Sequence, residues 1–248
     1  MRIDVLFGPS MVSPATVTGR VVAVIDVLRA STTITTALAN GARKVVPLES
    51  ADAVITRAKQ FERADVRTAG EQKMQPIPGF DLGNSPREMT REAVDGKTVL
   101  FTTTNGTATL LAVQGARDVV IASYVNVAAV TSLLRTAARG GTDIGIVCAG
   151  RDRQMSLEDA ACAGRYARLV SKQMDGAELG DGAFACMVLD RRYGDRLDRL
   201  FADSEHGRAL VAAGFAEDLA ACGAVNAHPV IPVYQDRQIT LLGPDRER

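Results

Sequence analysis

The chain has 248 residues, 46% of them apolar and 4% aromatic, and its 29 basic and 29 acidic side chains give a formal net charge of +0. A chain of this length buries a sizeable core without disulfides. The charge balance argues against a nucleic-acid-binding protein, which normally carries a basic excess or stripe. No apolar run approaches the length that spans a bilayer, and the N-terminus resembles no signal peptide. We therefore expect a cytoplasmic protein without membrane contact.

The cysteines give no sign of disulfide or metal chemistry. Cys148, Cys162, Cys186 and Cys222 form no C-x-x-C pair and have no histidine nearby. We expect them to be reduced thiols in the interior. Cys162 and Arg168 do match the C-x5-R spacing of cysteine phosphatases, but they fall within a helical pattern instead of an anion-binding loop.

Strands and helices alternate through the first 150 residues. Six apolar, β-branched runs predict buried strands, at residues 3–7, 21–27, 44–48, 98–102, 118–122 and 144–148. Helix signals lie between them: Ser50 before 51–61, Ser85 followed by proline, and Asn126 before 127–138. This alternation predicts a mainly parallel sheet with helices on both faces, a three-layer α/β fold.

The last hundred residues follow a different pattern. Residues 157–223 are almost entirely helical in pattern, and 230–234 and 237–242 read as a hairpin around Gln235 and Asp236. We expect one α/β domain over residues 1–248, with a helical C-terminal portion and a terminal β-hairpin. Two closely packed subdomains, about 1–150 and 151–248, are the alternative.

Three predicted strands end in polar segments that each open a helix. Ligands of open α/β sheets bind beyond the carboxyl ends of the strands, where free helix N–H groups favour anions. Hydroxyl and guanidinium groups there suit a phosphate or sulfonate. Helix capping explains any one segment alone, but three such ends converge. The candidate residues are Arg29, Ser31, Thr32, Thr104, Asn105, Gly106, Thr107 and Arg151.

Several acidic residues are candidates for a metal site, and ordinary surface charge is the alternative for those that lie in a loop. Asp26 lies in an apolar strand, where an unpaired carboxylate is costly. The explanations open for it are a metal ligand, a nucleophile and the ion-pair partner of Arg29. Glu71 and Asp81 lie in a long Gly- and Pro-rich segment, 69–86, and have the hard oxygens that Mg²⁺ prefers.

At residues 156–159, Asp159 is expected to close a capping box, which leaves Glu158 as a further ligand candidate. Two histidines, His206 and His228, lie far from the strand ends in sequence, and neither suggests a general base.

Four segments resemble the signature blocks of the 2-phosphosulfolactate phosphatase family. They are DVLRASTT at 26–33, GFDLGNSP at 79–86, TTNGT at 103–107 and LEDA at 157–160, in the same order and at similar spacing. The resemblance extends from about residue 3 to about residue 164. It implies a Mg²⁺-dependent hydrolase that converts (R)-2-phospho-3-sulfolactate to 3-sulfolactate and phosphate, a step of coenzyme M biosynthesis in archaea.

The resemblance also implies a set of site residues. We expect Asp26, Arg29 and Glu71 to be catalytic, and Asp26, Glu71, Asp81 and Glu158 to form the Mg²⁺ environment. Asn84 joins the substrate-binding residues named above. Gln72 stands where the family places an arginine, so no specific sulfonate contact is assigned in this segment. The family also occurs where coenzyme M is not evidently made, so the substrate can be another phosphorylated hydroxy acid.

The sequence leaves several alternatives open. They are attack by water or by Asp26, a non-catalytic anion- or metabolite-binding protein, an isomerase or lyase of phosphorylated acids, and a homodimer.

Overall fold

The computed structural model describes residues 1–104, 106–152, 154–172 and 174–243. In these residues the strands form a single sheet in the order β5-β4-β6-β3-β11-β10-β7-β2-β8-β1-β9. The strands are β1 (Arg2–Leu6), β2 (Val21–Ile25), β3 (Lys44–Pro47), β4 (Val66–Gln72), β5 (Gln75–Pro76), β6 (Thr98–Thr102), β7 (Asp118–Ala122), β8 (Ile144–Cys148), β9 (Glu178–Leu179), β10 (Pro232–Gln235) and β11 (Gln238–Leu241).

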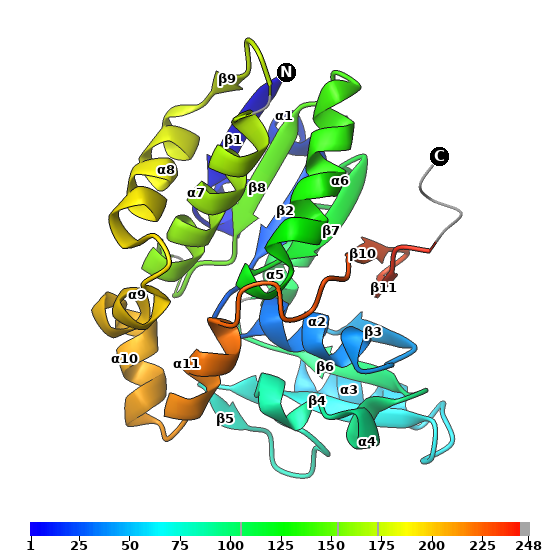
Figure 1. The fold of residues 1–248 in the computed structure, drawn as a ribbon. Coiled ribbons are helices and arrows are strands. Elements are labelled where there is room, and N and C mark those ends of the chain that lie inside the picture. The colour runs from blue at the N-terminus through cyan, green and yellow to red at the C-terminus, as the bar shows by residue number, and fades with distance from the viewer. Residues whose placement is uncertain (105, 153, 173, 244–248) are drawn as a thin grey trace.

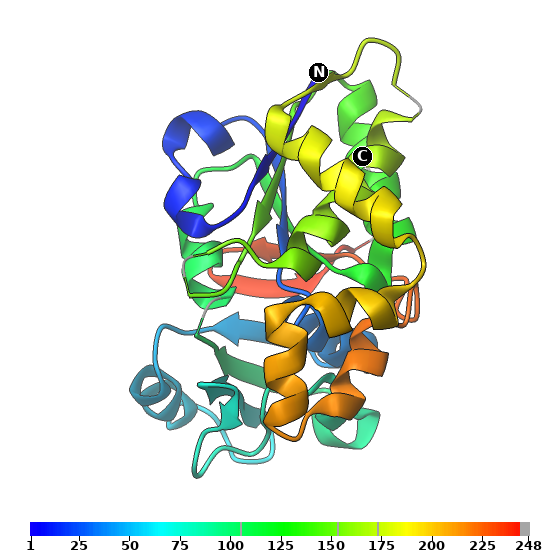
Figure 2. The same cartoon turned by 90° about the vertical axis from the view of Figure 1, so that its left-hand side faces the viewer.

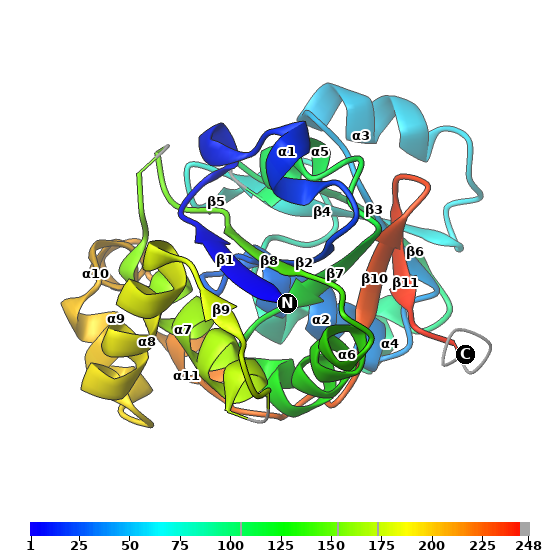
Figure 3. The same cartoon turned by 90° about the horizontal axis from the view of Figure 1, so that it is seen from above.

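The sheet contains two parallel sets of strands that run in opposite directions. In the first set, β2 pairs with β7 and β8, and β1 pairs with β8 and β9. In the second set, β6 pairs with β3 and β4. The β10–β11 hairpin lies between them and is antiparallel to both β7 and β3. The first set forms the upper half and the second the lower half in Figure 1, and Figure 3 shows the hairpin beside β7.

Helices cover both faces of the sheet, as the sequence predicts. They are α1 (Pro14–Val17), α2 (Ala30–Ala39), α3 (Ala51–Ala58), α4 (Arg91–Val94), α5 (Gly106–Ala112), α6 (Val127–Arg139), α7 (Leu157–Ser171), α8 (Asp181–Tyr193), α9 (Leu197–Asp203), α10 (Glu205–Ala212) and α11 (Ala216–Cys222). Short 3-10 turns are η1 (Pro9–Met11), η2 (Pro86–Glu88) and η3 (Tyr124–Asn126). Every residue of β2 is buried, because its alternate side chains enter separate apolar clusters on the two faces.

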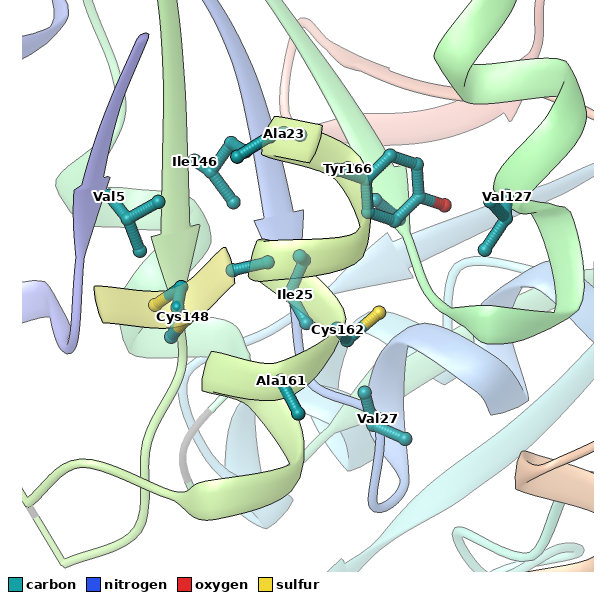
Figure 4. Close-up of a cluster of buried hydrophobic side chains, with 14 of the residues drawn as sticks. Val5, Ala23, Ile25, Val27, Val127, Ile146, Cys148, Ala161, Cys162 and Tyr166 are labelled. Carbon is teal, nitrogen blue, oxygen red and sulfur yellow. The ribbon is translucent and has the colours of Figure 1, made fainter. Parts of the chain in front are cut away.

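The apolar cluster on the α7 face fixes that helix against the ends of the central strands. Figure 4 shows Ile25 of β2 and Cys148 of β8 packed around α7, which contributes Ala161, Cys162 and Tyr166. All five of these side chains are 1% exposed or less. Small residues on the inner face of α7 bring its backbone close to the sheet, so its first turn sits at the carboxyl end of β2 and β8.

The predicted α/β class, the six strands, the helical C-terminal portion and the terminal hairpin are confirmed. The prediction of a long loop over 69–86 is wrong at its start, because residues up to Gln72 belong to β4. Gly70 breaks the apolar pattern there, and the backbone of Thr102 occupies the space that a side chain at position 70 would need. No described helix is long and apolar enough to cross a membrane.

Three short helices close the space beside the junction of the two sets. Helices α9, α10 and α11 follow one another from the upper to the lower half of the molecule (Figure 1), and Figure 2 shows them in front of that junction. They bring residues from the end of the chain to strand ends from its first half.

Candidate active site

Asp26 lies where the two sets of strands meet. It directly follows β2 and is 8% exposed. Its Oδ1 accepts a hydrogen bond from the backbone N–H of Ala30 at 3.2 Å, and its own N–H donates to Ser31 Oγ at 2.9 Å. A Cβ at Gly106 would lie 3.2 Å from Asp26 Oδ2, so the absent side chain lets the start of α5 approach the carboxylate. This contact joins the ends of β2 and β6.

The first turn of α7 adds two more buried acids. Asp159 Oδ1 accepts from the N–H of Val27 at 2.8 Å, and Oδ2 accepts from the N–H of Gly150 at 3.1 Å. Its carboxylate therefore joins the segments after β2 and β8 instead of forming the expected capping box. Glu158 is 1% exposed, and its Oε1 lies 3.2 Å from His206 Nδ1 on α10. Its Oε2 is buried and has no hydrogen-bond partner in the described part of the chain.

Burial and the charges of neighbouring acids favour the protonated forms of Asp26 and Asp159. Burial raises the pKa of Asp26 from 3.8 to about 6, and the nearby charges of Glu71 and Glu158 add to the effect, while His206 opposes it. Burial, followed by the charges of Glu158 and Asp26, raises the pKa of Asp159 well above its usual value. The site thus holds four carboxyl groups close enough to affect one another, with one histidine beside them.

Glu71 reaches this cluster from the other set of strands. It stands near the end of β4 and is 9% exposed. Its Oε1 accepts a hydrogen bond from the N–H of Thr104 at 2.8 Å, and its Oε2 accepts from the N–H of Met74 at 2.7 Å. The carboxylate therefore holds its own turn against the segment that leads into α5. Thr104 itself is exposed, and Asn105 lies outside the described residues.

Several buried polar atoms in the segments 79–86, 103–107 and 157–160 have no partner among the described residues. They are Asn84 Oδ1, Thr103 Oγ1 and Thr107 Oγ1, in addition to Glu158 Oε2. A cavity of about 10 Å³, close to the size of one water molecule, lies beside Asp26 and is lined by Thr103, Gly106 and Thr107. Buried polar groups are normally hydrogen-bonded, so atoms of this kind are those that a bound ligand would satisfy.

Arg29 pairs with Asp218 and not with Asp26, so of the three alternatives for Asp26 the ion pair with Arg29 is wrong. Its Nη1 donates to Asp218 Oδ2 at 2.8 Å, and both side chains are 2% exposed. Its Nη2 donates to the carbonyl oxygen of Met74 at 3.0 Å, and its guanidinium stacks 4.3 Å from the centre of the Phe215 ring. Arg29 thus links α11 to the turn that Glu71 holds.

Three further candidates are engaged by other groups. Thr32 Oγ1 donates to the carbonyl oxygen of Val27 at 2.9 Å and lies 2.7 Å from Ser123 Oγ. Ser31 Oγ accepts from the N–H of Asp26 and donates to the carbonyl oxygen of Val24 at 3.4 Å. Arg151 forms an ion pair with Glu205 at 3.4 Å, and 24% of its side chain is exposed at the rim of the site.

Asp81 is held apart from the acidic cluster. Its Oδ2 accepts from the N–H of Thr68 at 2.9 Å and from Thr68 Oγ1 at 3.0 Å, and its side chain forms an ion pair with Arg63. Burial disfavours the charged form, but the hydrogen bonds from Arg63 and Thr68 outweigh it and lower the pKa of Asp81. Asp81 therefore binds Thr68 of β4, in the second set of strands, and not the acidic cluster.

The interior thiols behave as the sequence predicts. All four cysteines are free and buried. Burial raises the pKa of Cys162 well above its usual value and that of Cys186 to about 12, so neither forms a thiolate nucleophile at neutral pH.

Sequence reasoning missed His206, Asp159 as a link between strand ends, and Asp218. His206 was expected to lie apart from the strand ends, but α10 places it against Glu158, 48 residues away in the chain. No local pattern signals this, since both His206 and Asp218 reach the site only through the packing of α9 to α11.

A buried acidic cluster with unsatisfied polar atoms, at the carboxyl ends of strands in an α/β sheet, is typical of an enzyme that acts on a small ligand. Comparison with known proteins gives the family. The family described as 2-phosphosulpholactate phosphatase matches residues 7–237, and the chain belongs to this family. The resemblance of the four signature segments is thereby confirmed.

Relatives match over nearly their whole lengths. A protein of Symbiobacterium thermophilum is 42% identical over 224 residues, which are 90% of this chain and 95% of the relative. A protein of Caldanaerobacter subterraneus subsp. tengcongensis is 39% identical over 85% of this chain and 86% of its own length. A protein of Thermotoga maritima is 35% identical over 93% of this chain and 94% of its own length. Each is named a probable 2-phosphosulfolactate phosphatase.

Proposed function

We propose that this protein is a cytoplasmic, Mg²⁺-dependent phosphomonoesterase. Its substrate is (R)-2-phospho-3-sulfolactate, or a related phosphorylated hydroxy acid, and its products are the free hydroxy acid and phosphate. The family and the names of the relatives support this reaction. The observation that carries the proposal is Glu158 Oε2, a buried oxygen of an acid without a partner among the described residues, in a cluster with Asp26.

The charge of the cluster supports a divalent cation. A substrate with phosphate, sulfonate and carboxylate groups is repelled by the ionised carboxylates of this cluster unless a cation lies between them. In the described ranges no three His, Cys, Asp or Glu side chains form a complete metal site on their own. Mg²⁺ suits such a site, because it commonly uses one or two carboxylates and completes its shell with water and substrate phosphate.

We assign Asp26 and Glu158 as the carboxylates that would hold the ion. When bound there, Mg²⁺ would neutralise charge that develops on the phosphate and orient an attacking group. Glu71 has both oxygens on backbone N–H groups, so its part is to position the 104–107 segment. Asp81 is left out of this environment, since Thr68 and Arg63 already engage it.

The hydroxyl and amide groups supply contacts for the anionic substrate. Thr103 and Thr107 line the cavity at Asp26 with hydroxyls that have no partner among the described residues, and hydroxyl donors suit phosphate oxygens. Asn84 offers an amide on the side of the second set, and Arg151 offers a guanidinium at the rim. Arg29, with Asp218 and Met74 on its guanidinium, positions the Glu71 turn.

Release of inorganic phosphate tests the proposal directly. The substrates are 2-phospho-3-sulfolactate, 2-phospholactate and 2-phosphoglycerate, each with Mg²⁺ and with EDTA. We expect Mg²⁺-dependent phosphate release from at least one of them, abolished by EDTA and by Glu158→Gln. Binding without turnover would support the anion-binding alternative, and a new organic product without phosphate release would support an isomerase or lyase.

Acid quenching during turnover of a ³²P-labelled substrate separates the two routes of attack. Label retained on the wild-type protein and lost in Asp26→Asn indicates an aspartyl-phosphate at Asp26. Absence of protein-bound label during measured turnover indicates attack by water.

A further inference from the structure

The outer face of α8 carries an arrangement that the proposed reaction does not use. Helix α8 packs along α7 and lies at the outer edge of the molecule in Figure 1, and toward the viewer in Figure 2. Phe184 is 60% exposed and Val188 is 49% exposed. They are four residues apart and therefore adjacent on the helix surface. A large aromatic side chain in water favours burial against another surface.

The exposed residues of α8 form one stripe with an ordered charge pattern. Asp181 stands at its first turn, and Arg191 and Arg192 stand at its last turn. The spacings of three and four residues place them on the same face as Phe184 and Val188. In the described part of the chain, neither Asp181 nor Arg191 has an ion-pair partner, so these charges are available to a second molecule. The stripe, referred to below as the α8 stripe, consists of Asp181, Phe184, Ala185, Val188, Arg191 and Arg192.

This pattern is complementary to itself when reversed. If two α8 helices lie antiparallel about a two-fold axis near position 186, Phe184 of each meets Val188 of the other. In the same register Asp181 of each helix meets Arg191 of the other. A two-fold interface requires that one patch match itself in this way. The acidic start and basic end also stabilise a single helix, but the exposed aromatic between them has no such explanation.

We propose that the α8 stripe is a homodimer interface, in which two copies of this chain pair through antiparallel α8 helices. The partner is a second copy of this chain, because in this register each charge of the stripe meets the opposite charge and each apolar residue meets an apolar residue. One helix pair covers less surface than a standard stable interface, so we expect a weak dimer whose population depends on protein concentration. The inference concerns association only and does not depend on the proposed reaction.

Sedimentation velocity of the whole chain, from about 1 µM to about 0.5 mM, measures this association. We expect a concentration-dependent monomer–dimer equilibrium in the wild-type protein. Phe184→Glu should weaken it at least tenfold, while the matched control Val211→Glu, an equally exposed apolar position on α10, should leave it unchanged. Both positions are exposed, so neither variant should lower the melting temperature much.

A charge exchange tests the register of the pair. Asp181→Arg alone places arginines opposite each other and should weaken the dimer, as should Arg191→Asp alone by placing two acids together. The double variant restores opposite charges and should recover most of the wild-type association. A wild-type protein that stays monomeric at the highest concentration overturns the proposal. So does a dimer that survives Phe184→Glu, or a double variant no better than the single ones.

Discussion

Helix α7 carries two clusters of buried charge, one toward each end, and they differ in how completely they are paired. Toward its C-terminal end, Asp190 of α8 accepts from Arg165 Nε and from Arg168 Nε, each at 2.6 Å, and its side chain is 1% exposed. Each carboxylate oxygen has a partner. At the N-terminal end, Glu158 keeps one oxygen without a partner in the described residues, and acids outnumber the single histidine.

The contrast separates a structural cluster from a functional one. Two arginines and one carboxylate, with Gly194 accepting from Arg165 Nη2 at 2.6 Å, form a set that needs nothing further. The acidic cluster is costly in the folded protein as it stands, because buried like charges raise one another's pKa. An arrangement of this kind becomes favourable when a ligand supplies the opposite charge. The predictions below test this difference.

The largest expected effect is on catalysis, from Glu158→Gln. The variant keeps the shape of the side chain and removes the charge that would hold the cation. We expect kcat/KM for phosphate release to fall at least ~10³-fold. Without the Glu158 carboxylate the cation is no longer held, so the charge that develops on the phosphate in the transition state is not neutralised. The melting temperature in EDTA should stay the same or rise. Near-normal turnover would show that the free oxygen has no catalytic part.

At the paired cluster we expect the reverse result. Asp190→Asn takes the buried counter-charge away from Arg165, which keeps its pair with exposed Asp195, and from half-buried Arg168. The free energy of unfolding should therefore fall by about 3 kcal/mol. The folded fraction should keep its kcat/KM within about twofold. Urea unfolding and phosphate release on the same preparation measure both. The control is Asp195→Asn: Asp195 also pairs with Arg165 but is 93% exposed, and we expect a change below about 1 kcal/mol.

Asp26→Asn should stabilise the protein at alkaline pH while it abolishes activity. The folded-state pKa of Asp26 is about 6, above the ordinary 3.8, so the folded state keeps a proton that the unfolded state loses. Stability contributed by this group is therefore present below pH 4 and lost as the pH rises through 6. Asparagine does not ionise, so in EDTA at pH 8 the variant should unfold with a free energy on the order of 3 kcal/mol higher than wild type.

Urea unfolding at pH 4 and at pH 8 checks the sign. The advantage of Asp26→Asn should shrink to below about 1 kcal/mol at pH 4, which is close to the ordinary pKa of 3.8 that applies in the unfolded chain. Added Mg²⁺ should stabilise the wild-type protein at pH 8 more than the variant, because a ligand that binds the folded state stabilises it. If Asp26→Asn were more stable than wild type by the same amount at both pH values, the gain would not come from the ionisation of Asp26.

The fold was largely predictable because burial on both faces leaves a local signature. The strands β2 and β8 consist of continuous apolar runs, and the hairpin has clear turn residues. The strand β4 escaped because Gly70 and Glu71 give it no apolar run. The opposite direction of the two strand sets also escaped, since it depends on where the final hairpin inserts between β3 and β7. No local pattern determines that position.

The site residues likewise fall into those that the sequence indicated and those that only the packing of distant helices revealed. Asp26 stood out because a carboxylate amid apolar neighbours needs an explanation, and Glu158 stood out because the capping box expected of Asp159 left it without a role. Residues brought by distant helices gave no such signal: Asp218 meets Arg29 across 189 positions of the chain. The sequence therefore singled out Asp26 and Glu158. The packing of α10 and α11 determined the partner of Glu158, which is His206, and that of Arg29, which is Asp218.

Arg29→Lys tests whether the α11 contact supports the unbalanced cluster. Lysine keeps the charge but cannot donate to Asp218 and to the Met74 carbonyl in the same geometry. We expect roughly a tenfold loss of kcat/KM, since the Glu71 turn shifts, together with a stability loss of about 1–3 kcal/mol. A large drop in melting temperature with unchanged kinetics would make Arg29 purely structural.

The smallest expected effect compares two buried hydroxyls that lack partners among the described residues. Thr107 lines the cavity beside Asp26, whereas Thr131 lies within α6. Valine replaces threonine with nearly the same shape, so the change removes only the hydroxyl. If Thr107 meets the substrate, Thr107→Val should raise KM about fivefold, the size of one neutral hydrogen bond.

Thr131→Val should leave KM and kcat unchanged and should raise the unfolding free energy by up to about 1 kcal/mol, because a buried unpaired hydroxyl is lost. Steady-state kinetics and urea unfolding of both variants decide the matter. Equal kinetics in the two variants would mean that an unpartnered polar atom at the acidic cluster carries no more information about the ligand than one elsewhere in the core. The contrast between the paired and the unbalanced ends of α7 would then rest on Glu158 alone.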